Sequence, residues 1–153
     1  MTRSYEIQRI CVLDYLSYIR NISDTLKQIQ ERIEQQEAAL GMLGISYSDL
    51  PKNPNLNTDK IPEGVIRLIE LKEEWCGYYY EYSRDYEKAK ALCLPAYIER
   101  HLLWLHYVDG KSWREVSKEV NYSRDYVQHL ARDGITELYQ LMPEQFTNLP
   151  SAI

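Results

Sequence analysis

The side chains best suited to chemistry in this chain are four polar groups at helical spacing, Arg124, Asp125, Gln128 and His129. In a helix they share one face, because residues three and four positions apart lie side by side. Arginine can bind guanine through two hydrogen bonds, glutamine can bind adenine in the same way, and a carboxylate can accept a hydrogen bond from cytosine. Such a face could recognise base edges if its helix lay in the major groove of DNA, and it could equally be a solvated surface of a small helical bundle.

Two short helices must position these side chains. Ser112 and Glu115 have the S-x-x-E spacing of a capping box, in which each side chain satisfies a free backbone N–H of the first turn. Ser123 is a second N-cap candidate, and Asn121 tolerates the left-handed backbone that a sharp corner needs. Both helices have an apolar face, formed by Trp113, Val116 and Val120 in the first and by Val127, Leu130, Ala131 and Leu138 in the second. Residues 111–138 therefore predict a helix-turn-helix.

This stretch resembles the last DNA-binding region of bacterial primary sigma factors, which recognises the −35 promoter element. Glu115-Val116-Ser117 matches the first helix of that pattern, and the run from Ser123 to Leu130 matches the start of its recognition helix. The fuller stretch LHYVDGKSWREVSKEVNYSRDYVQHL is more similar to phage-encoded sigma-region-4-like late transcription regulators, the RinA- and ArpU-like proteins. The resemblance covers about the last third of the chain and implies binding to double-stranded DNA at a promoter.

The resemblance assigns contacts with bases to Arg124, Asp125, Gln128 and His129. We expect contacts with the DNA backbone from Lys111, Ser112, Arg114, Lys118, Ser123 and Arg132. The first helix of such a motif crosses the phosphates, which places the residues around its start near them. The chain departs from the phage family at His106-Tyr107, where that family has Arg-Tyr. A histidine there keeps the aromatic packing but loses a fixed positive charge.

The remaining sequence predicts an all-α fold. Residues 5–43 favour one long helix, whose apolar residues alternate at spacings of three and four with a break at Gln36. The polar stretch 44–61 predicts a mobile loop. A second long helix follows from Pro62 to about Cys93, and its predicted seam consists of Val65, Ile69, Lys72, Trp75 or Cys76, Tyr79, Tyr82, Tyr86 and Ala89. Residues 96–108 are apolar on more than one face, which predicts the central helix of the C-terminal domain.

We expect three parts from these patterns. Residues 1–94 should form a long antiparallel helical hairpin, and residues 95–143 a sigma-region-4-like three-helix domain with the helix-turn-helix. Residues 144–153 lack periodicity and should form a flexible tail. The heptad spacing fits a hairpin within one chain and a coiled coil between two chains equally well, so a homodimer through the N-terminal helices stays open.

Several function classes are disfavoured by what the sequence lacks. Cys11, Cys76 and Cys93 are odd in number and widely spaced, so they form neither a disulfide framework nor a zinc pair. A reducing bacterial cytoplasm suits such cysteines. No apolar run approaches the ~18 residues that a membrane span needs. The absence of a P-loop, nucleophile motif or metal-ligand motif predicts that the protein is not an enzyme and has no catalytic residues, metal or cofactor.

The net charge of −5, from 18 basic and 23 acidic residues, is unusual for a DNA-binding protein, whose affinity comes largely from neutralised phosphates. We therefore expect the hairpin, a second copy or RNA polymerase to supply part of the affinity. The main hypothesis is a sequence-specific transcription regulator, namely a phage or prophage late-gene activator. One alternative is a protein-interaction module that binds RNA polymerase or another host protein. Another is a subunit like the phage small terminase, which marks DNA for packaging.

Overall fold

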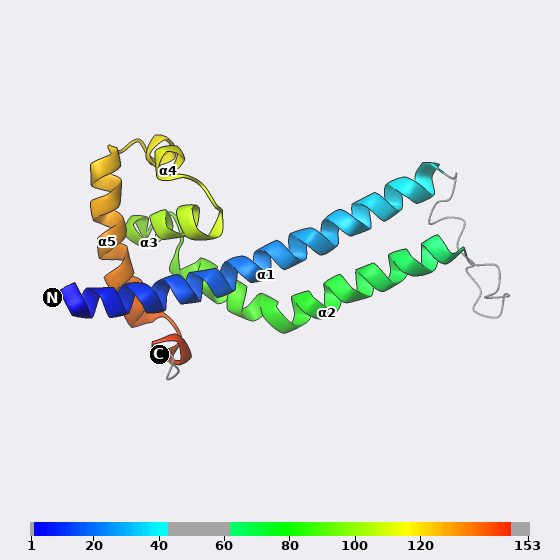
Figure 1. Cartoon of the computed structure of the whole chain (residues 1–153), viewed down its shortest axis with the longest axis horizontal. Coiled ribbons are helices and arrows are strands. Elements are labelled where there is room, and N and C mark those ends of the chain that lie inside the picture. Colours follow the sequence, from blue (N-terminus) through cyan, green and yellow to red (C-terminus); the bar gives the residue numbers. More distant parts are fainter. Residues whose placement is uncertain (1, 43–61, 148–153) are drawn as a thin grey trace. The chain divides into compact units, whose positions relative to one another are not determined.

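A computed structural model describes residues 2–42 and 62–147 of the chain. Its elements, in order, are α1 (Thr2–Met42), α2 (Glu63–Leu92), α3 (Ile98–Leu103), the π-helix η3 (Trp104–Val108), α4 (Trp113–Val120), α5 (Arg124–Leu141) and the 3-10 turn η4 (Glu144–Phe146) (Figure 1). No strand occurs among the described residues, and the predicted all-α fold is confirmed. The loop predicted over 44–61 lies outside the described residues. Within the described part, no helix is both long and apolar enough to cross a lipid bilayer.

The chain divides into two compact units. Unit 1 consists of residues 1–23 and 84–153, and unit 2 consists of residues 24–83. These borders differ from the predicted border at residue 94, because the start of α1 and the end of α2 belong to the same unit as α3, α4 and α5. Within unit 1, for example, the Tyr18 hydroxyl of α1 donates a hydrogen bond to the Asp85 carboxylate of α2 at 2.6 Å.

Unit 2 is an antiparallel hairpin made of the second half of α1 and the larger part of α2 (Figure 1). Its core is a single cluster of aliphatic side chains from both helices, Ile29, Ile33, Leu40, Val65, Leu68 and Leu71. The predicted break at Gln36 has a structural use, because its side-chain Nε2 donates to the Gly64 carbonyl oxygen at 3.0 Å. The seam therefore closes within one chain.

The seam of α2 follows the prediction at Val65 and Trp75 and departs from it at two other positions. Ile69 and Tyr79, which we expected on the seam, are 39% and 43% exposed. Leu68 and Leu71 are buried instead, and Tyr78 packs against the cluster that they form. Positions three and four residues apart both fit a helical seam, and the observed choice buries two leucines, which favours it because leucine burial is worth about 2 kcal/mol per side chain.

Unit 1 is built around α3 and η3, as the apolar run 96–108 predicts. Leu102 and Leu103 are fully buried, and Trp104, Leu105 and Val108 are nearly so. The Asp109 N–H donates to the Trp104 carbonyl oxygen, five residues earlier, at 3.0 Å, which is the π-helical pattern. The wider turn allows consecutive apolar side chains to face neighbouring elements on several sides.

Helix α5 packs closely against α3 at Gly134. A Cβ atom at this position would lie 2.4 Å from the Glu99 carbonyl oxygen, so only glycine fits without a backbone shift. Next to this contact, the Arg100 side chain donates to the Leu92 carbonyl oxygen and lies with its Nη1 4.0 Å from Glu137 Oε1. Arg100 therefore links the end of α2, the start of α3 and α5.

The tail that we predicted from residue 144 begins with η4 instead. The Phe146 ring centroid lies 5.0 Å from that of Tyr15 and 5.3 Å from that of Tyr18. The Tyr139 hydroxyl also donates to the Thr147 carbonyl oxygen at 3.2 Å. Residues 144–147 therefore form a short 3-10 turn that contacts α1, where we expected no regular structure, whereas residues 148–153 lie outside the described part.

Candidate nucleic-acid interface

Helix α4 begins with the predicted capping box. The Glu115 N–H donates to Ser112 Oγ at 3.1 Å, and the Ser112 N–H donates to Glu115 Oε1 at 3.4 Å. Two backbone donors that would otherwise lack partners are satisfied in this way. The start of the first helix of the motif is therefore fixed by its own side chains.

The corner between α4 and α5 is fixed by local hydrogen bonds. Asn121 adopts the predicted left-handed conformation, with φ 60° and ψ 37°. The Ser117 hydroxyl donates to the Tyr122 carbonyl oxygen at 2.6 Å, and the Tyr126 N–H donates to Ser123 Oγ at 3.2 Å. The second predicted cap is thus confirmed, and the direction in which α5 leaves the corner is set by residues 117–126.

The inner faces of the two motif helices pack as predicted. Val116 and Val127 are fully buried and Leu130 is nearly so. These side chains form one core cluster with Leu102 and Leu105, and Trp113, Val120 and Ile98 pack against it. Burial of this face dictates which side of α5 remains accessible to a partner.

The accessible side of α5 contains all the base-contact candidates. Arg124, Asp125, Gln128 and His129 are exposed, and so is Arg132 one turn further along. Their side chains differ in hydrogen-bonding capacity, since arginine only donates, aspartate only accepts, and glutamine does both. The arrangement provides the mixed set of donors and acceptors that reading a base sequence requires.

The candidates for contacts with the DNA backbone are not equally available. Ser112, Arg114, Lys118 and Ser123 are exposed. Lys111, in contrast, forms an ion pair with Glu119, and this hydrogen bond raises the pKa of the Lys111 amino group. The positive charge of Lys111 is therefore partly neutralised within the motif, which makes Lys111 a weaker phosphate contact than the predicted list implies.

Two exposed tyrosines at the corner are not among the DNA-contact residues predicted from the sequence. Tyr122 and Tyr126 are 43% and 48% exposed, and their rings meet edge to face with centroids 5.1 Å apart. They flank the Ser123 cap at the end of α5 that would enter a groove. The two tyrosines are four residues apart on either side of the predicted N-cap, and this spacing could have predicted that their rings meet at the corner. Aromatic rings at this position can contact thymine methyl groups.

His106 stands where the similar phage regulators have arginine, and it has the aromatic packing that we expected at this position. Its ring stacks on the Trp113 ring, with centroids 3.9 Å apart and planes 18° from parallel. Its Nδ1 lies 2.6 Å from the Lys111 carbonyl oxygen, and Tyr107 meets both rings edge to face. These rings pack against Trp113, the first residue of α4, so His106 acts here as a packing residue.

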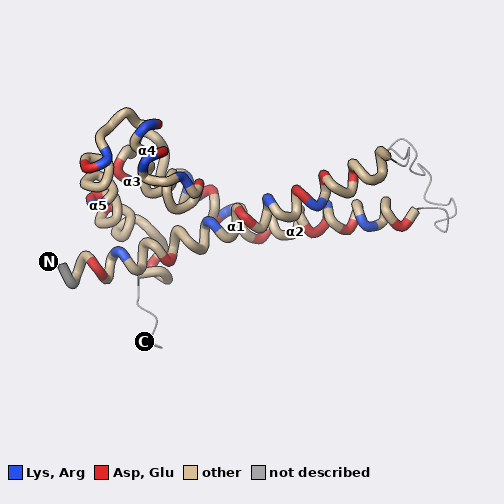
Figure 2. Tube along the Cα trace, turned by 45° about the horizontal axis from the view of Figure 1, so that its top comes forward, with Lys and Arg blue, Asp and Glu red and all other residues tan. Residues whose placement is uncertain are grey.

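Charge is mixed over the motif. Figure 2 shows basic and acidic positions interspersed along α4 and α5, as they are along the two long helices. Glu137, near the end of α5, has a raised pKa mainly because its carboxylate is partly buried, with a further contribution from Glu99. The acidic residues of α5 beyond Arg132 would repel phosphate, so its first two turns are the part suited to DNA.

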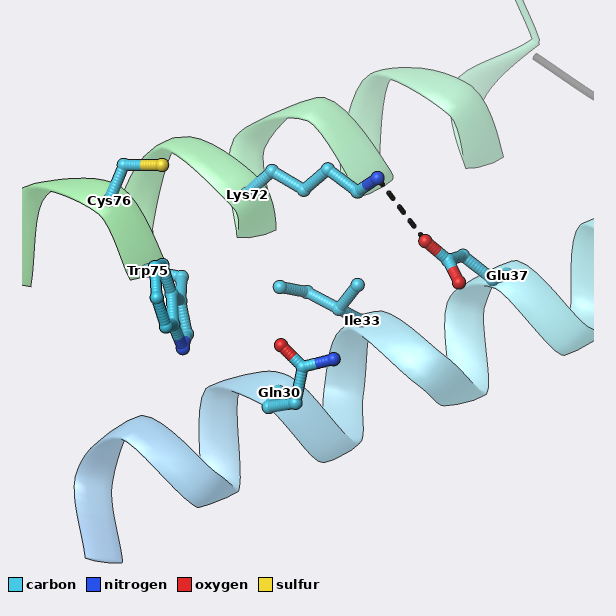
Figure 3. Close-up of a pocket in the computed structure, with 6 residues that line it drawn as sticks. All are labelled: Gln30, Ile33, Glu37, Lys72, Trp75 and Cys76. Atoms are coloured by element: carbon cyan, nitrogen blue, oxygen red, sulfur yellow. Dashed lines mark ion pairs between the residues drawn. The ribbon is translucent and has the colours of Figure 1, made fainter. Parts of the chain in front are cut away.

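A surface hollow of about 260 Å³ lies in unit 2, between the two helices of the hairpin (Figure 3). Ile33 and Trp75 line it, and the Lys72 amino group pairs with the Glu37 carboxylate across the seam at 3.2 Å. Its charged groups thus bind each other, which makes the hollow a part of the hairpin packing. Within the described residues, no cluster of three or more metal-binding side chains occurs.

Comparison of the chain with protein-family models, with curated proteins and with solved structures found no match.

Proposed function

We propose that this chain is a sequence-specific DNA-binding transcription regulator that acts at a promoter. The observation that supports the proposal best is the accessible face of α5. It presents Arg124, Asp125, Gln128 and His129 to solvent beyond a corner fixed by two capped helix starts. A helix-turn-helix places these first turns of its second helix in the major groove.

The resemblance to phage-encoded sigma-region-4-like regulators narrows the proposal to late-gene activation from a phage or prophage, in the cytoplasm of a bacterial host. In this proposal the N-terminal hairpin supplies a homodimer contact or a docking arm. Two linked motifs bind far more tightly than one, which compensates for the net charge of −5.

The test begins with the full chain and a pool of random-sequence duplexes, from which bound DNA is recovered and sequenced. We expect a defined motif to be enriched. Arg124→Ala and Gln128→Ala should each weaken binding to that motif by about 5- to 150-fold, which corresponds to about 1–3 kcal/mol per bidentate contact. Each variant should also relax the preference at one position of the motif.

Arg32→Ala is the matched control, because Arg32 is an exposed arginine of α1 in unit 2. Its affinity should equal that of the parent chain. If Arg124→Ala and Gln128→Ala bind the enriched motif as tightly as this control, then α5 is not the recognition helix.

A second candidate is a module that binds RNA polymerase through the same domain. The acidic balance favours it, together with the partial neutralisation of Lys111 by Glu119. Co-purification of polymerase with the chain after nuclease treatment, combined with the absence of salt-dependent DNA binding, would support this candidate over the first.

A further inference from the structure

A small cavity in unit 1 lies beside the recognition helix. It has a volume of about 160 Å³ and is bounded by the start of α1, by α3, η3 and α4, and by the middle of α5. Buried apolar side chains from α3 and α5 form its floor, including Leu103 and Ile135. Hydrogen-bonding side chains surround them, among them Tyr5, Arg9, Gln128 and Arg132.

The cavity contains two arginines without carboxylate partners. Among the described residues, neither Arg9 nor Arg132 forms an ion pair. The Arg132 guanidinium carbon lies 4.6 Å from the centroid of the Tyr5 ring. Burial raises the pKa of the Tyr5 hydroxyl, while Arg132 and Arg9 both act to lower it and Asp133 contributes a smaller opposite effect. The positive charges of Arg9 and Arg132 therefore both act on the Tyr5 hydroxyl, which lines the same cavity.

The available chemistry fits a phosphate group. A guanidinium presents a planar fork of N–H donors that matches phosphate oxygens, and two such forks with a phenol and an amide supply a surplus of donors. A water molecule occupies about 30 Å³ in the liquid, so the cavity has room for a group that replaces a few waters.

We propose that this cavity binds a phosphate of the DNA backbone, so that α1 forms part of the DNA interface. The inference rests on the proposed function, in which α5 lies in the major groove of DNA. Gln128 and Arg132 lie one turn apart on α5 and line the cavity, so a DNA strand beside α5 would pass the cavity. Tyr5 and Arg9 are the new members of the interface, and they come from a helix that the sigma-like resemblance does not cover. A free phosphate ion offers the same chemistry and is the competing source.

The experiment measures the affinity of the full chain for a short mixed-sequence duplex over a range of salt concentrations. Each phosphate contact contributes about 0.9 to the slope of log affinity against log salt. Arg9→Ala should lower that slope by about this amount, and Arg9→Glu should lower the affinity further. Arg32→Ala, on the same helix but in unit 2, should leave the slope unchanged.

Separate outcomes distinguish the two proposals. If the parent chain shows no salt-dependent binding, the proposed function fails. If the parent binds and Arg9→Ala has the parent slope while its helix content and unfolding temperature are unchanged, only the phosphate site is wrong. Arg9→Lys should restore most of the slope, because a lysine keeps the charge.

A second measurement identifies the source of the phosphate. The unfolding temperature of the parent and of Arg9→Ala is compared in phosphate and in chloride at equal ionic strength. Stabilisation of the parent alone by phosphate, together with an unchanged DNA slope for Arg9→Ala, would mean that the cavity takes a free anion and would overturn the DNA contact. A lowered slope supports the DNA contact.

Discussion

Unit 2 is held by one repeating seam of aliphatic side chains, whereas unit 1 is held by contacts between segments that lie far apart in the sequence. The seam of unit 2 joins two antiparallel helices through the same kind of contact at each turn. Unit 1 depends on individual close contacts, such as Gly134 against Glu99 and Phe146 against Tyr15. The difference suggests that single substitutions should affect unit 1 more severely, because a repeated contact can be weakened at one turn while the others persist.

The largest expected effect is loss of a fully buried leucine in unit 1. Leu102→Ala should lower the free energy of unfolding by about 2–5 kcal/mol, because its cavity is enclosed on all sides. Leu71→Ala in unit 2 should lie at the lower end of that range, since a pair of helices can close around the gap. Denaturant unfolding measures the loss, and hydrogen exchange shows where it occurs.

Leu102→Ala should speed exchange in α5, and Leu71→Ala should speed it in the hairpin alone. Equal acceleration throughout the chain by both variants would mean that the two units unfold as one, and the comparison would fail.

A pair of helical glycines gives the next largest effect, with opposite signs in the two units. Gly134→Ala should destabilise unit 1 by about 1–3 kcal/mol, because the new methyl group meets the Glu99 backbone at 2.4 Å. Gly77→Ala in α2 meets nothing within 4 Å and should stabilise unit 2 by about 0.5–1 kcal/mol through helix propensity. Thermal unfolding of both variants checks the signs. A stabilising Gly134→Ala would show that α3 and α5 are not in close contact.

Loss of the polar contact in the seam of unit 2 should have a smaller effect. Gln36→Ala removes the hydrogen bond to the Gly64 carbonyl oxygen and should cost about 0.5–1.5 kcal/mol. Gln35→Ala, at the exposed neighbouring position, is the matched control and should change stability little. Urea unfolding compares the two variants. If they are equally stable, the break in the heptad has no structural use.

The smallest effect concerns pH in unit 1. Burial raises the pKa of the Glu137 carboxyl, as do Glu99 and Asp133, while Arg100 lowers it. One carboxylate oxygen is buried without a hydrogen-bond partner. Because the folded pKa lies above the unfolded value, the folded chain binds more protons in the interval between them, so this group disfavours folding progressively as pH rises through that interval.

Glu137→Gln should therefore raise the unfolding temperature at neutral pH, and the gain should vanish as pH falls below the unfolded carboxyl pKa. Glu31→Gln, at an exposed position of α1 in unit 2, serves as the control for the loss of one negative charge. A gain that persists unchanged at low pH would contradict the explanation, because the carboxyl is then protonated in both states.

The parts of the structure that the sequence predicted are those whose partners lie within a few residues. Ser112 meets Glu115 three positions away, and Ser123 meets the backbone of Tyr126 at the same spacing. Asn121 needs only its own left-handed conformation. These contacts follow from local backbone geometry, so residue type and spacing suffice to predict them.

The parts that the sequence did not predict depend on partners far along the chain. The Gly134 contact with Glu99 and the bond from the Cys11 thiol to the Thr147 carbonyl oxygen, which spans 136 positions, have no local signature. Part of the α2 seam was predicted at the wrong positions for another reason, since Leu68 and Ile69 both fit the helical spacing and only packing against α1 selects Leu68. The cavity beside Arg132 could not be predicted either, because it forms only where α1 packs against α5.

Assembly of unit 1 from residues 1–23 and 84–147 has a consequence during synthesis on the ribosome. The hairpin of residues 24–83 contains both of its helices once α2 has emerged, so it can form early. The first turns of α1 must wait until α5 and η4 have left the exit tunnel, because Tyr5 meets Arg132 of α5 and Tyr15 meets Phe146 of η4. A nascent chain halted before residue 124 would therefore leave the Tyr5 and Tyr15 rings of α1 without these partners and accessible to chaperones.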